Sequence, residues 1–69
     1  MDISKKIKLA ETYAGVSEAE LARRIGTTSQ AFGQRVKTGK FSSSDLDAIA
    51  EALGCQARFE FRFPDGTII

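Results

Sequence analysis

The spacing of apolar positions predicts four short helices in the first part of the chain. Apolar residues recur there every three or four positions, and a residue type that caps helices stands before each run. The caps are, in order, Asp2 or Ser4, Ser17, Thr28 and Ser42. Asp45 follows the last cap at the spacing of a capping box. The predicted helices cover residues 3–14, 18–25, 29–37 and 43–53.

Each predicted helix has one apolar side, and we expect these sides to face a shared core. The inward residues are Ile3, Ile7, Ala10 and Ala14, then Leu21, Ala22 and Ile25, then Phe32 and Val36, and finally Leu46, Ile49, Ala50 and Leu53. The connections are short, and the chain has no repeat and no low-complexity stretch. The sequence therefore predicts a single domain over residues 1–69.

The period of the pattern changes to two near the C-terminal end. Polar residues alternate there with Cys55, Ala57, Phe59, Phe61 and Phe63. Such alternation is typical of a strand, and the following Asp65-Gly66 pair favours a two-residue type I′ turn. We therefore expect a β-hairpin over residues 55–69, with strands at about 56–63 and 67–69. Two strands alone are marginal in water, so the hairpin needs either the helical body beneath it or strands of a second molecule beside it. The predicted fold class is mostly α with a C-terminal β-hairpin.

Composition excludes several kinds of site and location. The chain has one cysteine, Cys55, and no histidine, which excludes an internal disulfide and a zinc site built from Cys and His. No apolar run reaches the roughly 18 to 20 residues that cross a bilayer, and the N-terminus lacks the apolar core of a signal peptide. We expect a cytoplasmic protein with no membrane contact, no metal and no cofactor.

Charge is distributed unevenly along the chain. The formal net charge is +1, but residues 1–40 carry +4 and residues 41–69 carry −3. A basic first part suggests a polyanionic partner for that part alone. Uneven surface charge with no such partner is the plain alternative.

The second and third predicted helices have the arrangement of a helix-turn-helix, whose second helix lies in the DNA major groove. They are joined by a turn that begins with Gly26. The stretch SEAELARRIGTTSQAFGQRV resembles the helix-turn-helix of Cro and phage-repressor (XRE-like) transcription regulators of bacteria. The resemblance rests on the Leu21-Ala22 pair, on Gly26 four residues later and on Phe32 six after that. It covers about residues 3–54 and implies a repressor-like four-helix domain.

The outer face of the third predicted helix carries residues suited to reading bases. Phe32 and Val36 point inward on a helical wheel, so Gln30 and Gln34 lie on the opposite face with Gly33 at its flank. Glutamine pairs bidentately with adenine, an alanine methyl meets the thymine methyl, and a glycine lets the backbone approach the groove wall. Hydroxyls, backbone N–H groups and cations around this face can contact phosphates. The candidate DNA-binding residues are Ser17, Thr28, Ser29, Gln30, Ala31, Gly33, Gln34, Arg35, Lys37, Thr38 and Lys40.

Two positions depart from the family pattern. Glu18 stands where these regulators usually have a glutamine that contacts phosphate, and an anion there repels DNA. Arg35 falls where an apolar residue often sits, so its stem can pack against the protein while its guanidinium reaches a phosphate. Glu18 is therefore not a candidate contact, whereas Arg35 remains one.

These patterns predict a sequence-specific regulator of transcription that binds double-stranded DNA. The resemblance implies a repressor that acts as a homodimer on a palindromic operator, with C-terminal strands paired across the two-fold axis. The candidate dimerisation residues are Ala57, Phe59, Phe61 and Phe63. The alternative is a protein-binding adaptor or antitoxin-like module that captures a partner by β-addition at the strand edge.

An enzyme finds little support in this sequence. The chain has no histidine, no glycine-rich phosphate loop and no inward-facing pair of carboxylates on its predicted helices. We expect no small-molecule ligand, because 69 residues leave little room for a separate sensing pocket.

Overall fold

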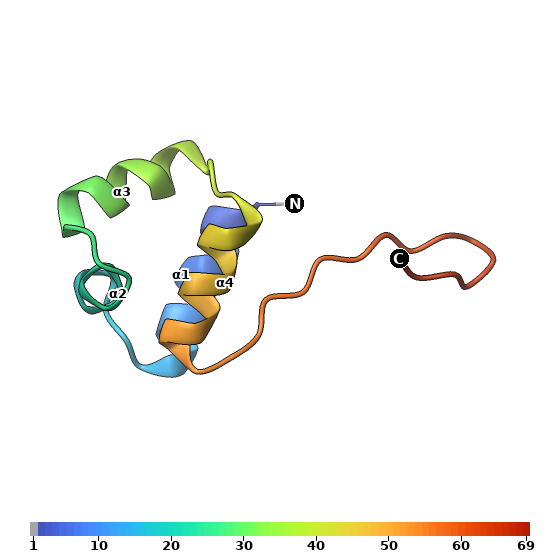
Figure 1. Ribbon diagram of the computed structural model, residues 1–69, viewed down its shortest axis with the longest axis horizontal. Coiled ribbons are helices and arrows are strands. Elements are labelled where there is room, and N and C mark those ends of the chain that lie inside the picture. Colours follow the sequence, from blue (N-terminus) through green and yellow to red (C-terminus); the bar gives the residue numbers. More distant parts are fainter. Residues whose placement is uncertain (1) are drawn as a thin grey trace.

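Four helices make up most of the protein, in the predicted order and nearly at the predicted positions (Figure 1). The computed structural model describes residues 2–69. The helices are α1 (Ile3–Ala14), α2 (Glu18–Arg24), α3 (Ser29–Thr38) and α4 (Ser43–Leu53). α2 ends one residue earlier and α3 one residue later than the sequence predicts. The prediction of a mostly helical domain with four helices is confirmed.

Side-chain caps fix the start of every helix. Asp2, Ser17, Thr28 and Ser42 each accept a hydrogen bond from the backbone N–H three residues further on. The capping box of α4 is complete: the Ser42 hydroxyl accepts from the Asp45 N–H at 3.1 Å, and the Asp45 carboxylate accepts from the Ser42 N–H at 2.8 Å. Because each cap is a local bond, the sequence alone located the helix starts.

The core lies where the four helices meet. Its buried apolar residues are Ile7, Leu21, Ala22, Phe32, Val36, Ile49 and Ala50. α2 packs against the other three helices, and α1 packs against α4. In Figure 1, α1 and α4 run beside each other while α3 crosses beyond one end of this pair. The Ser4 hydroxyl also donates to the Val36 carbonyl at 2.5 Å, which ties the start of α1 to α3.

The C-terminal segment, residues 55–69, does not form the predicted β-hairpin. Within residues 2–69 the only β-pairing is an isolated bridge between Arg62 and Ile68. Backbone hydrogen bonds of 2.7 and 2.9 Å join Phe61 and Ile69, but residues 56–60 form none. The segment is exposed throughout and runs away from the helices (Figure 1). The prediction was wrong because the returning residues 67–69 are too few to pair with a long strand, and no helix lies beneath to support it.

The turn in this segment also differs from the prediction. A type I′ turn needs positive φ at both Asp65 and Gly66, but only Gly66 has it, at 90°. Pro64 is fixed at negative φ by its ring. The Asp65 carboxylate accepts the Thr67 N–H at 2.9 Å, and the Gly66 N–H donates to the Phe63 carbonyl at 3.0 Å. The loop therefore has three residues, 64–66, with the glycine in the left-handed position.

Candidate nucleic-acid interface

α3 has two sides of opposite character. Phe32 is fully buried and Val36 is 6% exposed, so this side holds the helix in the core. Gln30, Gln34 and Lys37 are exposed, and their spacing of four and three residues places them together on another side. Ser29 and Ala31 are exposed as well. The structure therefore brings the predicted base-reading residues onto one solvent-facing surface, which we call the α3 face (Gln30, Ala31, Gln34 and Lys37).

The start of α3 offers backbone donors beside this face. Thr28 is the N-cap, and its hydroxyl already accepts the Ala31 N–H at 3.1 Å. In the described chain, the N–H groups of Ser29 and Gln30 have no hydrogen-bond acceptor. Such unpaired amides and the helix dipole favour an anion at this end. The Thr28 hydroxyl can bind a phosphate as a donor, because its hydrogen is not used by the cap.

Gly33 lies at the flank of the α3 face, opposite the start of α2. A Cβ atom built at Gly33 meets one atom of another residue within 4 Å, Oε2 of Glu18, at 3.9 Å. That distance is an ordinary van der Waals contact, so close packing within the protein does not require glycine at this position. Glu18 is half-buried and places a carboxylate next to the α3 face.

Glu11 is a buried carboxylate that the sequence analysis did not single out. Its side chain lies in the body of the protein at 7% exposure, and Oε2 has no hydrogen-bond partner among residues 2–69. Burial and, next, the carboxylate of Glu18 raise the pKa of Glu11. The sequence did contain one signal for the burial of Glu11, since it lies four residues after the core residue Ile7 and so on the same side of the helix. That signal was weak, because charged residues are rarely buried without a partner.

Arg35 is directed toward the first turn of α4. Its guanidinium forms an ion pair with Asp45 at 2.5 Å and lies over the Phe41 ring, 5.3 Å from the centroid. The Ser42 N–H and then the Arg35 side chain lower the pKa of Asp45 to about 2. The charge of Arg35 already has a partner, so Arg35 is a weaker candidate for a phosphate contact than an unpaired cation.

The end of α3 carries the remaining candidates. Lys37 and Lys40 are exposed, and neither takes part in an ion pair within residues 2–69. The Thr38 hydroxyl donates to the Arg35 carbonyl at 3.0 Å and accepts from the Lys40 N–H at 3.4 Å. Thr38 therefore shapes the end of the helix, while the two lysines are exposed cations beside it.

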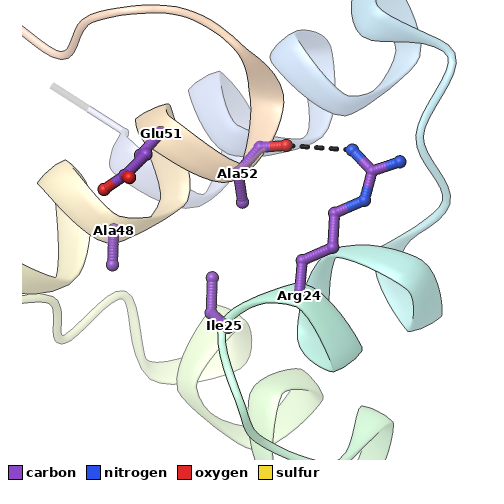
Figure 2. Close-up of a pocket in the computed structure, with 5 residues that line it drawn as sticks. All are labelled: Arg24, Ile25, Ala48, Glu51 and Ala52. Carbon is purple, nitrogen blue, oxygen red and sulfur yellow. Dashed lines mark hydrogen bonds between the residues drawn. The ribbon is translucent and has the colours of Figure 1, made fainter.

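A shallow cleft lies between the end of α2 and α4 (Figure 2), and no residue of α3 lines it. Its volume is about 530 Å³, and its lining residues are Arg24, Ile25, Ala48, Glu51 and Ala52. The Arg24 guanidinium donates to the Ala52 carbonyl at 2.9 Å and so satisfies a carbonyl in the last turn of α4. This contact joins two helices and offers no set of groups for catalysis.

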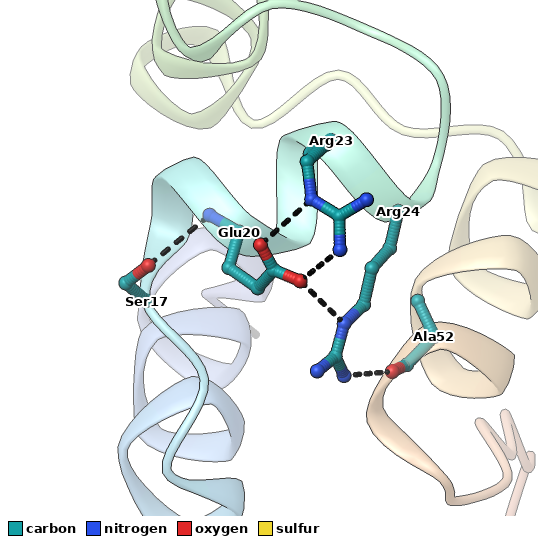
Figure 3. A network of polar contacts seen from close by, with 5 residues as sticks. All are labelled: Ser17, Glu20, Arg23, Arg24 and Ala52. Atoms are coloured by element: carbon teal, nitrogen blue, oxygen red, sulfur yellow. Dashed lines mark hydrogen bonds and ion pairs between the residues drawn. The ribbon is translucent and has the colours of Figure 1, made fainter.

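The same arginine belongs to an ion-pair network on α2 (Figure 3). Glu20 accepts from Arg23 and from Arg24, and these bonds, chiefly those of Arg23, lower the pKa of Glu20 to about 2. Ser17, a predicted phosphate contact, caps α2 by accepting the Glu20 N–H at 3.1 Å. The i+3 and i+4 spacing of these arginines from Glu20 was a sequence signal for the network.

The candidate dimerisation residues Ala57, Phe59, Phe61 and Phe63 are all exposed. The Phe59 and Phe61 rings meet edge to face with centroids 5.0 Å apart. They lie away from the α3 face, on the segment that leaves the helical body.

Two general features bear on the kind of site. Among residues 2–69 there is no group of three or more His, Cys, Asp or Glu side chains placed to hold a metal ion. In the same part of the chain, no helix has the length and apolar character needed to cross a bilayer.

Comparison with models of protein families, with curated protein sequences and with solved structures finds no match to this chain in any of the three.

Proposed function

We propose that the protein is a sequence-specific regulator of transcription that binds double-stranded DNA. In this proposal α2 and α3 form a helix-turn-helix, and α3 enters the major groove with the α3 face toward the bases. The observation that carries the proposal is the two-sided character of α3. Phe32 and Val36 anchor it in the core, while two glutamines and a lysine remain on one exposed side.

The chemistry of the surroundings supports phosphate contacts beside this face. The unpaired N–H groups at the start of α3 can bind one phosphate, and Lys37 and Lys40 can bind others. Glu18 opposes binding at one flank. The net charge of +4 on residues 1–40 supplies the sequence-independent attraction.

We propose further that the regulator is a homodimer that represses by occupying a palindromic operator. Two α3 helices then read half-sites about one helical turn apart. The exposed phenylalanines of the C-terminal segment support pairing between copies, because isolated chains seldom expose several large apolar side chains along one short segment.

A protein-binding module is the second candidate function. It is favoured by residues 56–60, which are exposed and whose backbone groups have no partner within residues 2–69, so that they are accessible for β-addition. In that case α3 is only a structural helix, and its glutamines are solvent-exposed helix residues.

Selection from a pool of randomised duplexes, followed by sequencing, tests the DNA proposal. At about physiological salt we expect enrichment of an inverted repeat whose half-site centres lie about 10 to 11 base pairs apart and contain adenines. A folded protein that enriches no sequence would contradict DNA recognition and favour the protein-binding module.

Three alanine variants then assign roles on the selected operator. Gln34→Ala should cost about 1 to 3 kcal/mol on the selected sequence only, because it removes a base contact. Lys37→Ala should weaken binding to all duplexes about equally and reduce the salt dependence. Lys8→Ala is the matched control, since Lys8 is an exposed cation on α1 rather than on the α3 face. Equal losses from all three variants would indicate a general charge effect and no base reading.

A further inference from the structure

An apolar groove runs between α1 and α4 and is open to solvent. Its volume is about 720 Å³. The core residues Ile7, Ile49 and Ala50 reach its floor, and Leu46 and Leu53 are further apolar lining residues. The groove therefore leaves the half-buried Leu46 and Leu53 partly open to solvent along one side of this small domain.

The C-terminal segment borders this groove but does not fill it. Cys55 and Phe59 are among its lining residues, and the segment then leads away from the helices (Figure 1). Phe59, Phe61 and Phe63 are 65%, 58% and 49% exposed. The molecule therefore has an open apolar groove and, on the same chain, an unpacked row of apolar side chains.

We propose that the groove of each molecule is filled by the C-terminal segment of a second copy, with Phe61 and Phe63 as the inserted side chains. The two contacts are equivalent: each protomer gives its segment to the partner's groove and receives the partner's segment in its own. A two-fold axis relates them and closes the assembly at two molecules. The inference rests on the homodimer of the proposed function, but not on its DNA contacts.

The exposed area corresponds to a small, weak interface. At 150–250 Å² for each aromatic residue, the exposed fractions of Phe61 and Phe63 leave roughly 210 Å² of inserted phenylalanine surface on each chain. Two segments and the groove surfaces that they cover then bury roughly 850 Å² in total, the size of a weak, transient interface.

The direction of the chain favours a second copy over the chain's own segment. Residues 56–60 form no backbone hydrogen bond within residues 2–69, and CQARFEFRF contains no glycine or proline at which the chain readily reverses. The first turn comes only at Pro64, beyond all three phenylalanines. A molecule that kept its own Phe61 and Phe63 in its groove would have to reverse direction within a stretch that has neither glycine nor proline.

Sedimentation equilibrium of paired variants tests the exchange. Phe61→Asp removes an inserted side chain, and Ala10→Lys blocks the groove from the half-buried side of α1. Ser43→Lys blocks the groove at its exposed rim and replaces no buried side chain. We expect each change to raise the dimer dissociation constant at least about tenfold, since apolar anchors in pockets dominate interface energies. Leu9→Asp is the control, because Leu9 is exposed on α1 but does not line the groove, and its dimer constant should not change.

Mixing separates exchange from other arrangements. A Phe61→Asp chain keeps an intact groove, and a Ser43→Lys chain keeps an intact segment. Their mixed dimer retains one complete contact, so an equimolar mixture should associate more tightly than either variant alone. If the groove variants leave the dimer constant unchanged while Phe61→Asp raises it, the segments pair only with each other and the groove inference is wrong. A native protein that stays monomeric, with Phe61→Asp lowering its thermal midpoint, would place the segment in its own groove and overturn the exchange.

Binding to a duplex with a single half-site reports on the DNA function separately. A monomeric variant that still binds this half-site, with the affinity dependent on Gln34, leaves the DNA proposal intact. If the native dimer forms by exchange but binds no half-site, the DNA proposal fails and the groove inference stands.

Discussion

Replacing Gly33 by alanine should stabilise the protein and weaken its binding to DNA. The other five glycines have positive φ, whereas Gly33 lies inside α3 with an ordinary helical backbone. A Cβ atom at this position meets only Glu18 Oε2, at 3.9 Å, so the methyl group fits without a clash. Glycine inside a helix costs about 1 kcal/mol relative to alanine, and we expect the variant to recover that amount. For a domain of this size the gain corresponds to a rise of about 4–8 °C in the thermal midpoint.

The loss in DNA binding follows from the place of Gly33 beside the α3 face. If α3 enters the major groove, a methyl group at this flank holds the backbone away from the groove wall. We expect an affinity loss of about tenfold for the selected operator, which corresponds to about 1.4 kcal/mol. A more stable variant with weaker function is the expected sign of a residue kept for binding.

Circular dichroism during heating and fluorescence anisotropy on the operator measure the two effects. Ala48→Gly is the matched control, because Ala48 is an exposed residue inside α4 and away from α3. It should lower stability by about 1 kcal/mol and leave DNA affinity unchanged. A fall in the stability of Gly33→Ala would refute the packing argument. A gain in stability with unchanged affinity would show that nothing approaches Gly33 in the complex.

Three further changes test the charges around the site. Glu18→Gln removes an anion beside the α3 face and should tighten binding to every duplex. Anisotropy titrations with two unrelated sequences measure this effect, and unchanged affinities would place Glu18 away from the phosphates. Glu11→Gln should raise the free energy of unfolding at pH 7 by about 1 kcal/mol, because the orphaned buried carboxylate is replaced by a neutral group. The pKa of Glu11 is raised in the folded state, so the stability gained by Glu11→Gln should shrink as the pH falls toward the ordinary carboxyl pKa of 4.5. Urea titrations should therefore show a larger difference between the variant and the native chain at pH 7 than at pH 4. Asp45→Asn should lower the urea midpoint at pH 7. Because the pKa of Asp45 is lowered to about 2, the difference in midpoint from the native chain should fade as the pH drops from 3.8 toward 2. A difference that stays constant with pH would contradict a stabilising role of the Asp45 charge.

Local signals in the sequence accounted for the helices and for part of the candidate site. The capping box of Ser42 and Asp45 and the inward pair Phe32 and Val36 depend on residues a few positions apart, so their spacing was sufficient. The exposure of Gln30 and its neighbours followed from the same helical period.

Features that depend on distant partners were not predicted. The ion pair of Arg35 with Asp45 exists only because the end of α3 comes beside the start of α4, and the sequence does not state that geometry. Glu11 lies on a buried side of α1 although its charge favours solvent. The hairpin prediction was wrong for a related reason. Alternation of apolar and polar residues shows that a strand is possible, but a hairpin also requires a neighbouring strand of equal length.

The separation of the C-terminal segment from the helical body has a consequence for how such a protein diverges. Residues 60–69 are exposed and do not line the groove between α1 and α4, so substitutions there can alter which copies associate without disturbing a buried residue of the four helices. The outer positions of α3 are equally free, because the buried residues of that helix are Phe32 and Val36. After a gene duplication, one descendant can therefore acquire a new binding specificity on α3, while another acquires a new dimerisation partner. In each case a few substitutions are enough, and they leave the buried core of the four helices unchanged.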